Sequence, residues 1–169
     1  PAPDPIGHAN ATARCAAAVS NAGPALTFNG MAPAAYLGNY KIFGSPTLND
    51  YATDDVIITA LEDALNDGFD IASISLGSLA FSGPLDVDPQ ACGGICDPSA
   101  YAVQQAIEHG LVVVAAAGND GDDTDIPTLA TVGSPADAPL AIAVGATTNS
   151  HVLEPGVRVT GSGFPSDLA

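Results

Sequence analysis

Apolar residues recur along this chain with two alternating spacings. Four short runs are continuously apolar or rich in strand-forming residues, at positions 36–43, 70–76, 111–117 and 140–146. Three other stretches carry apolar or small residues at helical spacing, at positions 11–19, 53–68 and 97–109. The pattern predicts the order helix, strand, helix, strand, helix, strand, strand.

Residues that cap helices flank the second and third helical stretches. Thr53 is a good N-cap for the second, and Gly68 is suited to end it. Asp97 and Pro98 form an N-cap followed by a first helical residue, and Gly110 follows the last turn. Spacing and caps therefore agree on two helices that connect strands.

Apolar strands joined by helices predict a parallel sheet that is covered on both faces. We therefore expect an α/β fold of three layers, in which helices lie on both sides of a parallel sheet. In such sheets ligands bind beyond the carboxyl ends of the strands. The exits at Leu76-Gly77 and Gly118-Asn119 should then lie on the functional edge.

Composition limits the core and the partners. Hydrophobic residues make up 47% and aromatic residues 5%, so the core must consist of Ala, Val, Ile and Leu. Three Lys and Arg stand against 19 Asp and Glu, which gives 3 − 19 = −16. Such a surface repels phosphate backbones and anionic lipids, so we expect no nucleic acid and no membrane partner.

The chain opens on Pro-rich sequence without a signal peptide, and we expect the parent protein to start upstream.

Two of the three cysteines lie close together in a loop. Cys92 and Cys96 are separated by Gly-Gly-Ile, and the two glycines permit a tight disulfide. Two free thiols or a metal-binding pair are the alternatives, although two ligands are too few for structural zinc. A disulfide would imply an oxidising compartment. Cys15, in an Ala-rich helical run, is expected to be buried and unpaired.

Two segments suggest chemistry. His8 stands where a loop meets a helix, and a histidine in such a place can act as a general base. Asn119 follows an apolar strand through Ala-Ala-Ala-Gly, and a fixed Asn amide can donate to an oxyanion. Together these segments resemble the subtilisin-like serine proteases (subtilases, peptidase family S8).

The resemblance assigns roles to both residues. The family's histidine motif is Gly-His-Gly-Thr-x-x-Ala, and here Ala9 and Asn10 replace its Gly and Thr while Ala13 matches. By resemblance His8 is the base that deprotonates a serine nucleophile. Asn119 is the side-chain donor to the oxyanion of the tetrahedral intermediate.

Further matches extend over residues 7 to about 148. Gly30-Met31-Ala32-Pro33 and Ser134-Pro135 match elements that support the fold. By resemblance, Ser75-Leu76-Gly77 pairs with the backbone of the substrate, and Ala115-Ala116-Ala117-Gly118 forms the wall of the pocket for the residue before the scissile bond.

The family's triad also needs an Asp and a Ser. Asp4 follows no strand and lies too near His8, and Ser162 lacks the family's Gly-Thr-Ser context. We therefore expect residues 1–150 to be the central part of a subtilase catalytic domain, with both missing residues elsewhere in a secreted parent endopeptidase. Residues 151–169 are expected to begin an inserted protease-associated domain or a linker.

Other interpretations remain open. A catalytically dead subtilase-like domain would bind peptides or act as a scaffold, and an unrelated α/β domain would bind a small ligand, although no Gly-rich phosphate loop follows any strand. We expect no cofactor and no metal. The acidic residues after Asn119 fit a solvated loop better than a calcium site and would favour cationic substrate side chains: Asp120, Asp122, Asp123 and Asp125.

Overall fold

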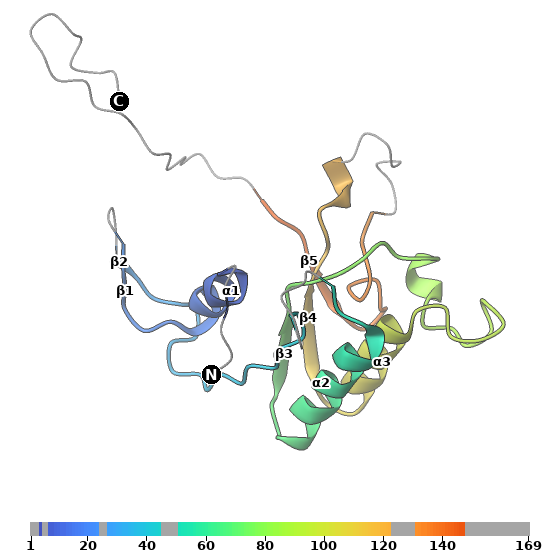
Figure 1. Cartoon of the computed structure of the whole chain (residues 1–169), viewed down its shortest axis with the longest axis horizontal. Helices are drawn as coiled ribbons and strands as arrows, with labels where there is room; N and C mark the ends of the chain where they lie inside the picture. Colours follow the sequence, from blue (N-terminus) through green and yellow to red (C-terminus); the bar gives the residue numbers. More distant parts are fainter. Residues whose placement is uncertain (1–3, 5–6, 24–26, 45–50, 123–130, 148–169) are drawn as a thin grey trace, which may run out of the picture.

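From α2 (Asp54–Asn66) onward, the helices and strands follow the predicted order. The computed structural model describes residues 4, 7–23, 27–44, 51–122 and 131–147. Figure 1 shows the elements in chain order: α1 (His8–Ala17), β1 (Asn21–Ala22), β2 (Thr27–Phe28), α2 (Asp54–Asn66), β3 (Ile71–Ile74), the 3-10 turn η1 (Gly83–Leu85), α3 (Pro98–Glu108), β4 (Val112–Ala116), the 3-10 turn η2 (Asp120–Asp122) and β5 (Ile142–Val144).

Strands β3, β4 and β5 form one parallel sheet with β4 in the centre. Ile71 pairs with Val112, and Val114 pairs with Ile142. Helix α3 connects β3 to β4, so the carboxyl ends of these strands meet at one edge of the sheet. The predicted α/β fold with a parallel sheet is confirmed.

The hydrophobic core lies between this sheet and helices α2 and α3. Val113 and Ala115 of β4 point toward the helices and are 1% exposed. Leu61 of α2 and Val103 of α3 belong to one buried cluster with Val113, because each helix presents an apolar stripe to the sheet. The buried cluster comprises Ile57, Leu61, Ala100, Val103, Ala106, Leu111, Val113 and Ala138.

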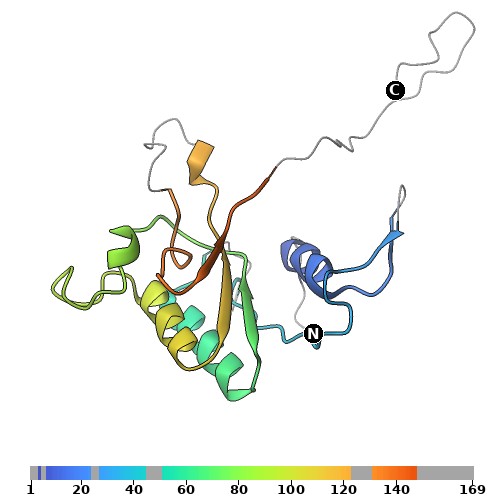
Figure 2. The ribbon, with the colours of Figure 1, turned by 180° about the vertical axis from the view of Figure 1, so that it is seen from behind.

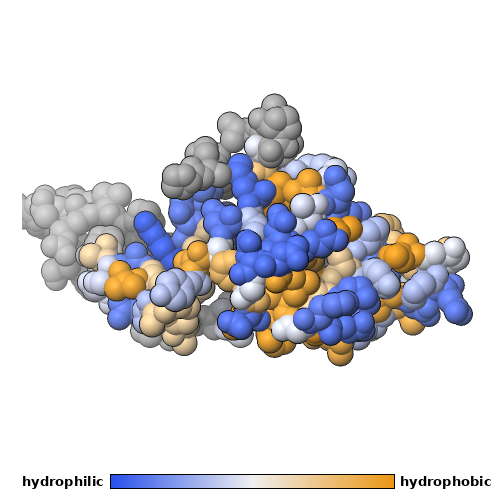
Figure 3. All heavy atoms as spheres, turned by 90° about the horizontal axis from the view of Figure 1, so that it is seen from below, coloured by the Kyte–Doolittle hydropathy of each residue, from blue (hydrophilic) through white to orange (hydrophobic). Residues whose placement is uncertain are grey.

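The opposite face of the sheet is also apolar, but it is exposed. Ile71, Val112, Ile142 and Val144 lie on this face, with exposed fractions of 62, 45, 51 and 50%. Helix α1 lies on this side of the sheet, across from α2 and α3 (Figures 1 and 2), but leaves these side chains accessible. Figure 3 shows apolar patches on the side of the molecule that it presents.

The predicted N-caps of the two core helices differ, because one forms capping hydrogen bonds and the other does not. The Asp97 carboxylate accepts hydrogen bonds from the N–H groups of Ser99 and Ala100, at 2.9 and 3.0 Å. Helix α2 also begins after its predicted N-cap, Thr53, but that side chain makes no capping hydrogen bond. Gly110 ends α3 with a φ of 104°, a value that glycine adopts without strain.

The strand predicted at residues 36–43 is wrong, because this segment forms no strand. Its contact with the residues just before β3 is made by a side chain and not by backbone hydrogen bonds between strands. Tyr40 donates a hydrogen bond of 2.6 Å to Asp67 and packs edge-on against Phe69. The hydrogen bond with the Asp67 carboxylate raises the pKa of Tyr40 to about 12. Tyr36, by contrast, is almost fully exposed.

The N-terminal region departs from expectation in two details. A short antiparallel pair, β1 with β2, follows α1 where the apolar spacing predicted no strand. Cys15 is unpaired as expected, but the prediction that it is buried is wrong. Helix α1 packs at its C-terminal end against the backbone of residues 30–32, and Met31 N–H donates to the Cys15 carbonyl. The Cys15 side chain therefore stays outside the core.

The disulfide, the membrane and the C-terminal segment are the remaining subjects of prediction. Cys92 and Cys96 are disulfide-bonded, with their Cα atoms 5.4 Å apart. Within the described ranges, no helix is both long and apolar enough to span a bilayer. The predicted segment at 151–169 lies outside the described residues.

Candidate active site

His8 is the first residue of α1 and lies against the end of β3. Asp4 fixes this helix start, because its carboxylate accepts from the N–H groups of Gly7 and Asn10, each at 2.8 Å. The His8 Nε2 atom lies 3.0 Å from the Ser75 carbonyl oxygen, although 67 positions separate the two residues. The fold therefore brings the predicted base to the predicted substrate-binding segment.

The partner of His8 determines which ring nitrogen carries a proton. A carbonyl oxygen only accepts, so Nε2 is the donor in this contact. To take a proton from a nucleophile through Nε2, the ring has to exchange this hydrogen bond for one with the nucleophile. Ala9, which replaces the glycine of the family motif, lies within the helix, where its backbone does not require glycine.

Asn119 is exposed just beyond the carboxyl end of β4. The chain leaves the strand through Gly118, whose φ of 97° falls in the left-handed region that favours glycine. Since β3 and β4 are parallel neighbours, Asn119 lies at the same edge of the sheet as Ser75. The Ser75 carbonyl that contacts His8 and the predicted oxyanion donor Asn119 thus follow neighbouring strands at the same edge of the sheet.

The segment Ser75-Leu76-Gly77 continues beyond β3 without a ladder partner in the described part of the chain. Ser75 and Gly77 are exposed, whereas Leu76 is half-buried against the core. An exposed extended segment of this kind can pair with a peptide through its main-chain groups.

The predicted pocket wall divides into a buried part and an accessible part. Ala115 faces α2 and α3 within the core, so its side chain is not available to a ligand. Ala116 and Gly118 are exposed and Ala117 is half-buried. The accessible wall is therefore residues 116–118.

A returning segment completes this edge, although its sequence indicated only a role in the fold. Ser134 forms an antiparallel bridge with Ser78, with N–H to carbonyl distances of 2.9 and 3.0 Å. Gly133 N–H also donates to the Ala117 carbonyl at 3.0 Å. A Cβ atom on Gly133 would lie 2.4 Å from the Ser78 oxygen, so only glycine permits this approach. The Gly-Ser-Pro motif at 133–135 was the available signal.

Acidic groups surround the edge. The Asp120 carboxylate lies 3.3 Å from the position that a Cβ of Gly118 would occupy, next to the accessible wall. Asp86, Asp97 and Asp137 are buried behind the edge. Burial, the adjacent Asp86 carboxyl and the charge of Asp97 raise the pKa of Asp137 to about 7. Among the described residues no group of three or more His, Cys, Asp and Glu is placed to hold a metal ion.

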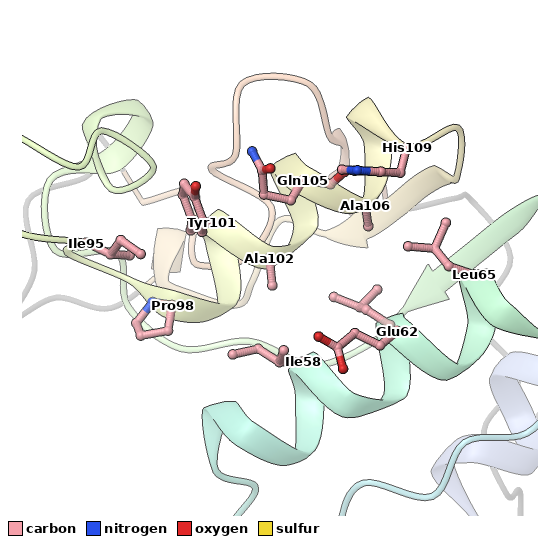
Figure 4. A pocket seen from close by; sticks show the side chains of 11 residues that line it. Ile58, Glu62, Leu65, Ile95, Pro98, Tyr101, Ala102, Gln105, Ala106 and His109 are labelled. Atoms are coloured by element: carbon pink, nitrogen blue, oxygen red, sulfur yellow. The ribbon is translucent and has the colours of Figure 1, made fainter.

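A hollow in the described part of the molecule lies away from this edge. A cavity of about 420 Å³ opens between α2 and α3, lined by side chains such as Ile58 and Glu62 of α2 and Tyr101 of α3 (Figure 4). None of the residues predicted to take part in chemistry contributes to it. We therefore place the candidate site at the carboxyl edge, where the polar groups converge.

Comparison with known proteins identifies the family of this chain. The family model of the subtilase family matches residues 2–163. Subtilisin-like protease SBT4.11 of Arabidopsis thaliana is 32% identical over 127 residues, which cover 72% of this chain and 15% of that protein. Subtilisin E of Bacillus subtilis is 34% identical over 122 residues, which cover 72% and 27%. The CO(2)-response secreted protease of Arabidopsis thaliana is 39% identical over 72 residues, which cover 42% and 8%. The chain thus spans about a quarter or less of these relatives, and it belongs to the subtilase family.

Proposed function

We propose that this chain is the central part of the catalytic domain of a secreted subtilisin-like serine endopeptidase. His8 is the general base and Asn119 the oxyanion donor, and the triad Asp and Ser come from other parts of the parent protein. The observation that carries the proposal is the 3.0 Å contact between His8 Nε2 and the Ser75 carbonyl. It joins the histidine motif to the segment that would bind substrate.

The geometry supports the following reaction. A polypeptide pairs in extended form with residues 75–77, and one side chain lies along residues 116–118. The parent's serine Oγ attacks the scissile carbonyl carbon while His8 takes the serine proton. The Asn119 amide donates to the oxygen that becomes negative. His8 then protonates the leaving amine, and water releases the acyl group by the same steps.

Two observations support secretion. The Cys92–Cys96 disulfide requires an oxidising environment. One relative is named a secreted protease. The proposed partners are accordingly polypeptide substrates and the remainder of the parent chain.

A fluorophosphonate probe tests the proposal, because it reacts only with an activated serine. The full-length protein should be labelled and should hydrolyse peptides, and His8→Ala should abolish both. The 169-residue chain alone should give neither signal, since it lacks the nucleophile. A full-length protein that binds peptides but is neither labelled nor active would instead be a catalytically dead binding domain.

A further inference from the structure

Three buried aspartates gather where two loops meet behind the candidate site. Asp86 belongs to the loop at 79–97, which the Cys92–Cys96 disulfide closes, and it is fully buried. Asp97, 4% exposed, ends this loop, and its N–H donates to the Asp86 carbonyl at 3.3 Å. Asp137, 7% exposed, comes from the segment at 133–138 that returns along the edge. The Asp137 side chain is within hydrogen-bonding reach of the Asp86 carboxyl, so these two loops meet at carboxyl groups.

The three carboxylates differ in how they are satisfied. Asp86 accepts from the N–H groups of Phe81 and Ser82, each at 2.8 Å, with one oxygen each. Asp97 caps α3. Both oxygens of Asp137 are buried without a hydrogen-bond donor from another residue, and only the backbone N–H of Asp137 itself acts to lower its pKa. Ionised carboxylates only accept, so Asp137 and the adjacent Asp86 can bond to each other only when one of them holds a proton.

We propose that Asp137 and Asp86 form a proton-binding carboxyl pair that clamps the disulfide-closed loop 79–97 to the segment 133–138. Asp137 is the donor, because both Asp86 oxygens already accept backbone N–H groups. When the pair loses its proton, two negative charges face each other in a buried place and the two loops separate. The inference concerns this clamp and does not depend on the proposed peptidase activity.

The other groups around the pair strengthen its hold on the proton. Asp97 adds a third negative charge from the start of α3. Asp54 of α2 is linked to Asp97 through Ser99, whose hydroxyl donates to Asp54 at 2.8 Å and whose N–H donates to Asp97. No hydrogen bond or charge from a basic side chain to Asp137 is found in the described ranges, where the basic residues are Arg14, Lys41, His8 and His109. The α3 N-terminus, whose partial charge is positive, is already occupied by Asp97.

The sign of the pH effect follows from the direction of the pKa shift. The pKa of Asp137 rises from 3.8 to about 7, so the folded protein keeps a proton that the unfolded chain has released. The stabilisation is complete at acidic pH, below the ordinary value. It declines as the pH rises and is lost above about 7, where both states are deprotonated.

Amide hydrogen exchange in the full-length protein, with EDTA present, tests the clamp. The protection of Phe81 and Ser82 N–H, after correction for intrinsic rates, should fall severalfold between pH 5 and pH 8.5. Asp137→Asn should keep the protection nearly constant, because its amide donates to Asp86 at every pH. The control Asp88→Asn should behave like the wild type, since Asp88 is exposed in the same loop and caps only Gln90 N–H.

Two results would overturn the proposal. One is a pH dependence in Asp137→Asn equal to that of the wild type. The other is millimolar calcium that restores protection at pH 8.5 in the wild type but not in Asp137→Asn, since that would indicate a metal site. If Asp137→Asn does not fold, Asp86→Asn should also reduce the pH dependence, because it removes one of the two facing charges. This variant is read at the Ser78 and Ser134 N–H groups of the bridge, since Asp86→Asn itself removes an acceptor of Phe81 or Ser82 N–H. An Asp86→Asn variant with the wild-type profile would equally reject the pair.

Discussion

The helix-covered face of the sheet and its carboxyl edge are built in opposite ways. On the covered face, Leu111 and Val113 are 1% exposed and packed by helices of the same chain. At the edge, Ser75 and Asn119 are exposed and follow strands whose hydrogen bonding has ended. The chain therefore supplies one complete hydrophobic layer but only part of what a peptidase needs. Substitutions in the first region should affect folding, and those in the second should affect turnover.

The largest effect is expected at the edge, from Asn119→Ala in the full-length protein. Turnover should fall roughly 10²–10³-fold with KM little changed, because the amide meets the substrate oxygen mainly when charge develops. Steady-state kinetics on a peptide substrate measure this, and thermal stability should not change. Asn66→Ala, exposed at the end of α2, is the matched control. Turnover within twofold of wild type would make Asn119 a plain loop residue.

The two faces of the sheet can be compared directly by denaturant unfolding of the 169-residue chain. Leu111→Ala on the covered side should lower the free energy of unfolding by about 2–5 kcal/mol, because it leaves a cavity. Ile71→Ala on the opposite face of the sheet, which no helix in the described part of the chain covers closely (the bare face), should change the free energy of unfolding by only about 0.5 kcal/mol, since the side chain is 62% exposed. Equal losses would show that the bare face is covered in solution.

Gly133→Ala tests whether the returning segment shapes the edge. The added Cβ would lie 2.4 Å from the Ser78 carbonyl oxygen, so the Ser78–Ser134 bridge has to open. We expect a loss of about 1–3 kcal/mol in unfolding free energy, as for other overpacked sites, together with a reduced kcat/KM. Gly94→Ala is the control, because a Cβ there meets nothing within 4 Å. Identical behaviour of the two variants would contradict the close approach.

The smallest difference between two paired variants is expected for the two predicted N-caps of the covered layer. Asp97→Ala should lower the free energy of unfolding by about 1 kcal/mol, because the carboxylate satisfies two backbone N–H groups of α3. Thr53→Ala should have less effect, because the Thr53 side chain makes no capping hydrogen bond. Melting curves of both variants measure the difference, and the reverse order would contradict the structure at these helix starts.

Local signals in the sequence predicted most of the covered layer. Helices α2 and α3 and strands β3, β4 and β5 appear where apolar spacing, Asp97 and Gly110 indicated them. The strand expected at 36–43 failed because its residues favour strands but pair with none here. Cys15 was misplaced because an Ala-rich helix does not reveal what covers it.

The edge was predictable only in part. Family resemblance assigned roles to His8 and Asn119, and these remain predictions. The bridge between Ser78 and Ser134 joins residues far apart in the sequence, and neither residue type predicts such a pairing. The Asp86–Asp137 pair could not be predicted either, because its two residues are also far apart in the sequence. In a chain with 19 Asp and Glu, the sequence alone does not distinguish a buried carboxyl from an exposed one.

The most direct test of the central claim is to treat the full-length protein with a peptidyl chloromethyl ketone and map the modified residue by mass spectrometry. Such a reagent binds like a substrate, and the nitrogen of the catalytic histidine displaces its chloride. We predict alkylation at His8, slowed by a competing peptide substrate, with loss of activity in proportion to labelling. Labelling of His109 in place of His8, or inactivation without modification of His8, would contradict the assignment of the carboxyl edge as the catalytic site.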